Sequence, residues 1–222
     1  MKKNLVLLLI CFLSYSSGGL FSQNLTSGDL SVLKGQTLIN IRFDYSKMKV
    51  GDYDPEDEYK SAFKFNVIGE DEFIKKSVDA MNNKKAGSGE EWAAKWQRNK
   101  TELYHPGFEA AFNEKAMDCS LEVKENEAGA KYTMIVHVDF LEQGIQSRQL
   151  DETLKLASVN LTIDVVETAA PETILASIES TKNINSNNSN VNKNIYDPGW
   201  RLTNCYKAAG KSIAKFICKK LK

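Results

Sequence analysis

One long stretch of alternating residues, KYTMIVHVDFLEQG at positions 131–144, constrains the fold more than any other part of the sequence. Successive residues of a β-strand point to opposite faces, so residues two apart share a face. The residues that share the apolar face are Tyr132, Met134, Val136, Val138 and Phe140. The intervening positions are mixed in character. The pattern predicts a long strand with one fully apolar side, placed centrally in a sheet.

Further segments with strand or helix patterns predict what surrounds this strand. We expect strands at residues 37–45, 119–123, 156–167 and 173–180, and helices at 70–83, 88–103, 106–117 and 199–221. Residues 61–68 fit either a short strand or the lead-in to a helix. Together these segments predict an α+β fold: a mostly antiparallel sheet of four to five strands, with helices packed on one face, the C-terminal helix included.

Two short motifs suggest where the middle helices begin and end. Ser88 and Glu91 have the spacing of a capping box, which predicts a helix start. His105 precedes Pro106, and a residue before proline disfavours the α conformation. We therefore expect the chain to break there and a third helix to start at Pro106.

The N-terminal residues 1–22 have the features of a signal peptide. Lys2 and Lys3 precede a short apolar run, and small and polar residues follow it. Cys11 allows a lipoprotein alternative, but the bulky Ile10 before it makes a lipid anchor the weaker interpretation. The short, lysine-led signal is typical of bacteria, so we expect a periplasmic or secreted protein, with outer-membrane association as an alternative.

The sequence predicts that the mature chain consists of an N-terminal arm and one domain. We expect a polar N-terminal arm at 23–36 and a single α+β domain at 37–222, with a flexible Asn-rich loop at 184–194. The sequence has 29 basic and 29 acidic residues, and this balance argues against a nucleic-acid-binding surface covering the protein. No stretch after the signal peptide is long and apolar enough to predict a transmembrane segment.

Three cysteines remain after the signal peptide: Cys119, Cys205 and Cys218. Cys205 and Cys218 lie on one predicted helix, roughly 20 Å apart along its axis, and cannot bridge each other. Export permits a disulfide. Either Cys119 pairs with one of the other two, or all three remain thiols.

The sequence contains no catalytic, cofactor or metal motif of useful specificity. His137 and Asp139 share a strand face, but no third metal ligand is identifiable beside them. His105 is expected to be a hydrogen-bonded corner residue, and neither histidine has a flanking serine or cysteine motif. The acidic run at 52–58 lacks the glycine and the final glutamate of a calcium loop, which predicts a solvated loop.

Two sets of residues are candidates for a partner surface. Trp92, Trp96 and Tyr104 belong to an aromatic-rich helical segment, and aromatic residues dominate interaction hot spots. Lys207, Lys211 and Lys215 form a basic band on the C-terminal helix, suited to an acidic partner or a polyanion. The simpler alternatives are a core stripe for the aromatic set and a solvated face for the lysines.

The order of elements resembles that of the small periplasmic α/β domains of the TolB N-terminal, curli-secretion and penicillin-binding-protein-activator lipoprotein group. The matching segments are residues 132–144, 156–167 and 199–221. Residues 90–112 resemble uncharacterised exported proteins of Bacteroidetes. The paired helices around Trp92 depart from the group's pattern. The resemblance implies a non-enzymatic role in envelope scaffolding and protein–protein contact, and no site residue carries over.

These observations favour a non-catalytic, envelope-associated protein-interaction module whose partner is another envelope protein, without cofactor, metal or nucleic acid. The alternative is a periplasmic protein that binds a small ligand or polyanion on the open sheet face around His137 and Asp139. A third class, a hydrolase with catalytic residues dispersed in the sequence, has no motif to support it.

Overall fold

The computed structural model describes residues 22–53, 65–147, 152–184 and 193–222. The predicted signal peptide, apart from Ser22, lies outside the described residues. Most of the acidic run at 52–58 and most of the Asn-rich loop at 184–194 lie outside them as well.

The long alternating stretch forms strand β6 (Tyr132–Glu142). Tyr132, Met134, Val136 and Val138 are buried in the core, as the alternation predicts. A β-bulge between Val138 and Phe140 then changes the register with the neighbouring strand β9 (Ser158–Glu167). A bulge inserts an extra residue and reverses which side chains face inward. Leu141 is therefore fully buried, whereas Phe140 is only half-buried.

The α+β class agrees with the structure, but the expected sheet of four to five strands is wrong. The main sheet is mixed and has eight strands, in the order β1-β10-β9-β6-β2-β5, with β3 paired to β6 and β4 paired to β3. Its remaining strands are β1 (Ser22–Gly28), β2 (Leu38–Asp44), β3 (Lys49–Tyr53), β4 (Phe65–Gly69), β5 (Glu122–Glu125) and β10 (Ala170–Ile184). Strands β2 and β3 both run parallel to β6, and β2 also runs parallel to β5. A separate two-stranded sheet contains β7 (Ile145–Ser147) and β8 (Glu152–Lys155).

The residues expected as a polar N-terminal arm begin with the edge strand β1. This strand pairs antiparallel with β10. Its sequence, SQNLTSG, has one large apolar residue, Leu25, so hydrophobic alternation could not reveal it. Backbone hydrogen bonding to β10 holds the strand instead. Residues Leu30–Leu33 follow as a short 3₁₀ helix with Leu30 and Leu33 buried.

Two helices form a hairpin, α1 (Glu70–Lys84) and α2 (Ser88–Asn99). The predicted capping box is not formed. Gly87 is the N-cap in a left-handed conformation, and the Ser88 hydroxyl donates to the carbonyl oxygens of Met81 and Lys85 at 3.0 and 2.8 Å. Ser88 is therefore the first helical residue and fastens α2 to the end of α1.

The expected break at His105-Pro106 does not occur. A π-helical segment, Lys100–Tyr104, joins α2 directly to α3 (His105–Ala116). The His105 N–H donates to the carbonyl oxygen of Lys100, five residues back. A π-turn is one residue longer than an α-helical turn. Pro106 then falls in the first turn of α3, where proline is well tolerated.

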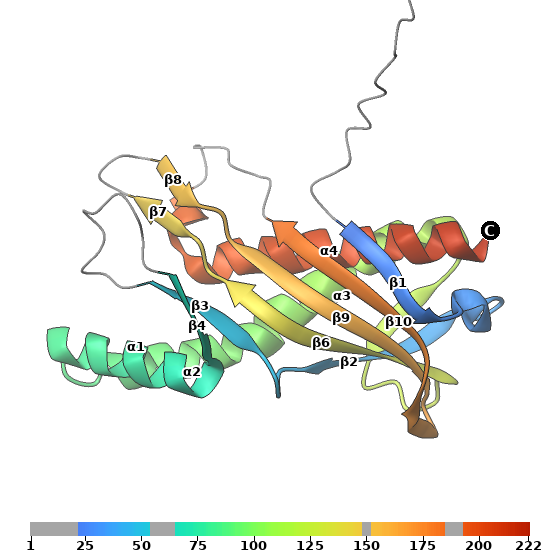
Figure 1. Cartoon of the computed structure of the whole chain (residues 1–222), viewed down its shortest axis with the longest axis horizontal. Coiled ribbons are helices and arrows are strands. Elements are labelled where there is room, and N and C mark those ends of the chain that lie inside the picture. Colours follow the sequence, from blue (N-terminus) through green and yellow to red (C-terminus); the bar gives the residue numbers. More distant parts are fainter. Residues whose placement is uncertain (1–21, 54–64, 148–151, 185–192) are drawn as a thin grey trace, which may run out of the picture.

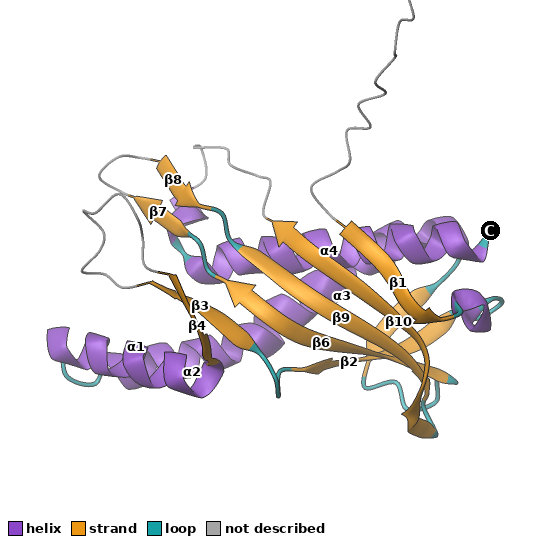
Figure 2. Cartoon of the chain, viewed as in Figure 1, coloured by secondary structure: helices purple, strands orange, loops and turns teal. Residues whose placement is uncertain are grey.

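Helices α3 and α4 (Pro198–Leu221) lie together behind the sheet, whereas the α1–α2 hairpin lies beside one end of it (Figure 1). Figure 2 shows that no described helix crosses the near face of β6, β9 and β10. The core between the sheet and the helices includes Met134 and Val138 from β6 and Tyr206, Ile213 and Ile217 from α4. The apolar flank of the central strand is thus covered by helices.

A disulfide joins Cys119, after α3, to Cys218 near the end of α4. This pairing decides between the alternatives left by the sequence: Cys205 is buried and remains a thiol. Within the described residues, no helix has both the length and the apolar character needed to cross a membrane.

Candidate functional site

The α1–α2 hairpin places an aromatic cluster next to the body of the domain. Gly89 is buried where α2 meets α1; a Cβ atom there would lie 2.5 Å from the carbonyl oxygen of Val78. This close approach brings together Phe73, Trp92 and Trp96. The two indole rings are stacked with centroids 5.6 Å apart, and Phe73 lies 5.8 Å from Trp92 and 5.2 Å from Trp96.

A groove runs beside this cluster, which we call the Trp92 groove. It contains two adjoining hollows, of about 360 and 200 Å³, that share Met81, Trp92, Gln143 and Pro198 as lining residues. The hairpin forms one wall of the groove. The loop after β6 and the start of α4 form the other.

The second wall is held rigidly by Arg201 of α4, which is 6% exposed. Its guanidinium group donates hydrogen bonds to three backbone carbonyl oxygens, those of Gln143 at 2.9 Å, Ile195 at 2.6 Å and Gly144 at 3.2 Å. Burial lowers the pKa of this group. Arg201 therefore fixes the loop after β6 to the start of α4.

The structure brings together half of the predicted partner surface. Trp92, Trp96 and Tyr104 all line the smaller hollow of the groove. Trp96 and Tyr104 are buried, at 4% and 1% exposed, and Trp92 is partly exposed. The aromatic stripe is therefore core at two positions and partly exposed at the third, where Trp92 packs against the core.

The predicted lysine band lies elsewhere. Lys207 follows Pro198 by nine residues, which is roughly 14 Å along the helix axis, and Lys211 and Lys215 are farther still. All three are exposed. The ammonium group of Lys211 lies 3.2 Å from the carboxylate of Glu114 on α3. The six predicted residues thus form two separate surfaces.

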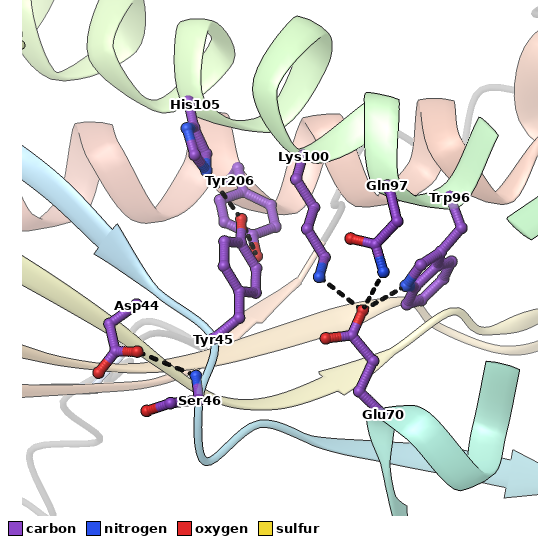
Figure 3. A network of polar contacts seen from close by, with 9 residues as sticks. All are labelled: Asp44, Tyr45, Ser46, Glu70, Trp96, Gln97, Lys100, His105 and Tyr206. Carbon is purple, nitrogen blue, oxygen red and sulfur yellow. Dashed lines mark hydrogen bonds and ion pairs between the residues drawn. The ribbon is translucent and has the colours of Figure 1, made fainter. Parts of the chain in front are cut away.

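A buried polar cluster supports the aromatic wall from behind. In Figure 3, Trp96, Gln97 and Lys100 converge on the carboxylate of Glu70. The Glu70 Oε1 atom accepts from Trp96 Nε1 at 2.6 Å and from Gln97 Nε2 at 3.4 Å, and it lies 2.5 Å from Lys100 Nζ. The first residue of α1 is therefore tied to both α2 and the π-helical segment.

A second polar chain begins at Tyr206 and ends at Glu125. The Tyr206 hydroxyl donates to Tyr45 at 3.4 Å, and the Tyr45 hydroxyl lies 3.2 Å from His105 Nε2 (Figure 3). His105 Nδ1 lies 3.2 Å from the carboxylate of Glu125. Burial, reinforced by the positive charge of Lys100, lowers the pKa of His105 to about 4 despite this carboxylate. The neutral ring then accepts from Tyr45 and donates to Glu125.

These titratable groups are packed into the structure. The His105 ring stacks on Phe43 with a centroid separation of 3.9 Å, and burial raises the pKa of both Tyr45 and Tyr206. Glu70, Lys100 and His105 line neither hollow of the Trp92 groove. Their arrangement supports the fold, as expected for His105, and presents no reactive group to the groove.

The open sheet face carries the other histidine. His137 lies between two carboxylates, with Nδ1 2.8 Å from Asp44 and Nε2 3.2 Å from Asp164. Asp139 accepts a hydrogen bond from Thr162 at 2.8 Å, and burial raises the pKa of Asp139. Among the described residues, no group of three or more His, Cys, Asp or Glu side chains is placed to hold a metal ion.

Sequence patterns could not reveal the residues that line the groove from its second wall or support it from behind. Lys100 has the pattern of an exposed helical lysine, and Gln143 and Arg201 carry no motif. Asp197, however, precedes Pro198-Gly199 and has the pattern of a helix start. Its carboxylate accepts from the Gly199 N–H at 2.8 Å and caps α4.

Comparisons with known proteins give no family. No family model matches the chain, and no curated protein matches it. Among solved structures, the chain is similar to the PelC dodecamer from Paraburkholderia phytofirmans and to a variant of it. In both cases the identity is 10%, the match covers 85% of this chain and 96% of that chain, and the TM-score is 0.32. These values are too low to carry a functional argument.

Proposed function

We propose that the protein is a non-catalytic, exported interaction module that binds another protein of the cell envelope in the Trp92 groove. The observation that carries this proposal is Trp92 itself. Its indole is partly exposed over a groove whose other aromatic residues, Trp96 and Tyr104, are buried. Tryptophan is enriched among the residues that dominate the energy of protein contacts, so a partly exposed Trp92 beside a preformed groove is suited to anchoring a partner.

The groove is suited to binding because its walls are fixed. Glu70 holds α1 to Trp96 and Lys100, and Arg201 holds the opposite loop to α4. A site that is ordered before binding loses little conformational entropy when the partner arrives. The Cys119–Cys218 disulfide supports the export part of the proposal, because disulfides persist in oxidising compartments.

The alternative function, binding of a small ligand or polyanion around His137 and Asp139, receives less support. Asp44 and Asp164 flank His137, and Asp139 lies on the same strand. These carboxylates would repel an anionic ligand. The lysine band of α4 fits a solvated face, since Lys211 is already paired with Glu114.

Site-specific photo-crosslinking in the living host cell tests the proposal. A photoreactive amino acid at Met81, inside the groove, is compared with the same amino acid at Ile174, an exposed apolar position on β10 outside it. We expect one discrete adduct from position 81 and no matching adduct from position 174. The Trp92→Ala change should abolish the adduct. Equal adducts at both positions, or an adduct unaffected by Trp92→Ala, would contradict the proposal.

A further inference from the structure

The floor of the Trp92 groove contains a buried hydroxyl group whose O–H has no acceptor among the described residues. Tyr104 is 1% exposed, and its hydroxyl oxygen makes no hydrogen bond of ordinary geometry to any described residue. Tyr206, which stacks on it with ring centroids 4.9 Å apart, is equally buried but is hydrogen-bonded to Tyr45. A buried hydroxyl without a partner is destabilising, so this one is suited to a group that enters the groove.

The surroundings of this hydroxyl define what can enter. Tyr104 lines the smaller hollow together with Asn99 and Asp197. Burial raises the pKa of Tyr104, and the Asn99 amide, which donates toward the Tyr104 oxygen in a distorted geometry, opposes that rise. The Asn99 amide is therefore directed at the Tyr104 oxygen, and the Tyr104 O–H remains available to donate to one small polar group in the hollow.

The charges that line the smaller hollow offset each other. Its charged lining residues, Lys95 and Asp197, lie 3.4 Å apart and offset each other. A charged group entering the hollow would lose its hydration without gaining an opposite charge. The balance therefore favours a neutral occupant.

The size of the smaller hollow and the chemistry of its walls further restrict which neutral group can bind there. The volume of about 200 Å³ is below that of pockets that enclose a whole drug-sized ligand, so the hollow fits a single ring. Trp92 and Met81 form its outer part, and both interact favourably with aromatic rings. The side chains that line the smaller hollow become less exposed from Lys95 at its rim to Tyr104 at its floor. An aromatic ring with one neutral polar tip matches this gradient.

We propose that the smaller hollow is the anchor subsite of the groove and binds a tyrosine side chain of the partner protein. The partner's ring lies against Trp92 and Met81, and its hydroxyl group accepts a hydrogen bond from the Tyr104 O–H. A phenylalanine would leave the Tyr104 hydroxyl unpaired, and a charged residue would be left unneutralised. This inference rests on the proposed function and adds the chemistry of the partner.

Nuclear magnetic resonance titration of the isotope-labelled mature protein tests the subsite with small probes. The probes are N-acetyl-tyrosinamide, N-acetyl-phenylalaninamide and methyl glucoside. We expect the tyrosine probe to shift the Trp92 indole and Gly199 amide signals and to bind about tenfold more tightly than the phenylalanine probe, the worth of one hydrogen bond. Equal binding of the two amino-acid probes, or tighter binding of the glucoside, would overturn the inference.

The Tyr104→Phe variant provides the matched control. Removing the hydroxyl should reduce the preference for the tyrosine probe to less than about twofold, which is the loss of that one hydrogen bond. The free protein should lose little stability, because among the described residues the Tyr104 O–H has no acceptor before binding and its oxygen makes only a distorted contact with the Asn99 amide. A less stable variant that keeps the full preference for tyrosine would show that the hydroxyl serves the fold alone.

The two proposals can fail separately. If the probes show no tyrosine preference but Trp92-dependent crosslinking at position 81 persists, the groove binds a partner through other chemistry. If that crosslinking is absent while the tyrosine preference is present, the subsite exists but the envelope-protein partner is wrong.

Discussion

At the scale of single residues, the most consequential contact outside the core is the ion pair between Lys100 and Glu70. Lys100 is 8% exposed, and its Nζ atom lies 2.5 Å from Glu70 Oε1. Both side chains are shielded from water, so removing one charge leaves the other buried without compensation. This pair fixes the position of α1 and with it one wall of the Trp92 groove.

The Glu70→Gln change removes the charge but leaves an oxygen that can accept from Trp96. We expect the free energy of unfolding to fall by about 3 kcal/mol, because the Lys100 charge stays buried. Urea unfolding monitored by tryptophan fluorescence measures the loss. Lys211→Ala, at an exposed pair, is the control and should cost less than about 1 kcal/mol. Equal losses in the two variants would refute the structural role assigned to Glu70.

His105 makes stability depend on pH. Its pKa is lowered to about 4 in the folded protein, from an ordinary value of 6.5. Below pH 6.5 the unfolded chain therefore takes up a proton that the folded protein resists, and stability falls as the pH falls toward 4. The His105 contribution to this loss is at most about 3 kcal/mol.

Urea unfolding at several pH values between 7 and 4.5 tests the His105 prediction. The wild type should lose stability faster than His105→Gln as the pH falls, because glutamine does not titrate. Parallel curves for the two proteins would mean that His105 keeps an ordinary pKa in the fold.

Residue patterns in the sequence grouped some of the residues that line the groove. The aromatic-rich helical segment grouped Trp92, Trp96 and Tyr104, and the structure places them around one hollow. The roles of Glu70 and Lys100 could not be predicted, because they belong to different elements and meet only when α1 packs on α2. Local spacing gives no information about such tertiary neighbours.

At the scale of elements, α3 and α4 approach each other closely at Gly210. A Cβ atom at this position would lie 2.4 Å from the carbonyl oxygen of Phe108, a backbone atom that cannot move alone. Gly107, on the other helix, is different: a Cβ atom there would first meet the side chain of Thr203 at 3.3 Å. The two glycines therefore form a matched pair.

We expect Gly210→Ala to lower the free energy of unfolding by about 2 kcal/mol, because the helices must move apart. Helix propensity alone would predict the opposite, a gain of about 1 kcal/mol. Gly107→Ala should leave stability nearly unchanged. Chemical denaturation of both variants measures the difference, and stabilisation by Gly210→Ala would show that the helices are not in close contact.

Elements with their own hydrophobic pattern were predictable, and elements defined by pairing were not. The alternation in β6 and β9 and the apolar stripe of α4 indicated their positions closely. The edge strand β1 and the five-residue β3 lack such a pattern and exist through hydrogen bonds to β10, β4 and β6. The parallel pairing of β2 and β3 with β6 depends on the path of the whole chain, which explains the underestimated strand number.

At the scale of the whole molecule, the helix-covered sheet and the α1–α2 hairpin have different roles. The sheet, α3 and α4 form the core, while the α1–α2 hairpin and the start of α4 enclose the Trp92 groove. The central claim is that this groove is the binding surface. It implies that two neighbouring tryptophans on the same helix have different roles, Trp96 in the fold and Trp92 in binding.

Parallel measurement of stability and of affinity for the crosslinked partner, in Trp92→Ala and Trp96→Ala, tests this claim most directly. Trp96→Ala should lose about 3 to 5 kcal/mol of unfolding free energy, as a buried aromatic residue does. Trp92→Ala should lose only about 1 kcal/mol of stability but at least about 2 kcal/mol of binding free energy. Full partner binding by a folded Trp92→Ala protein would contradict the account.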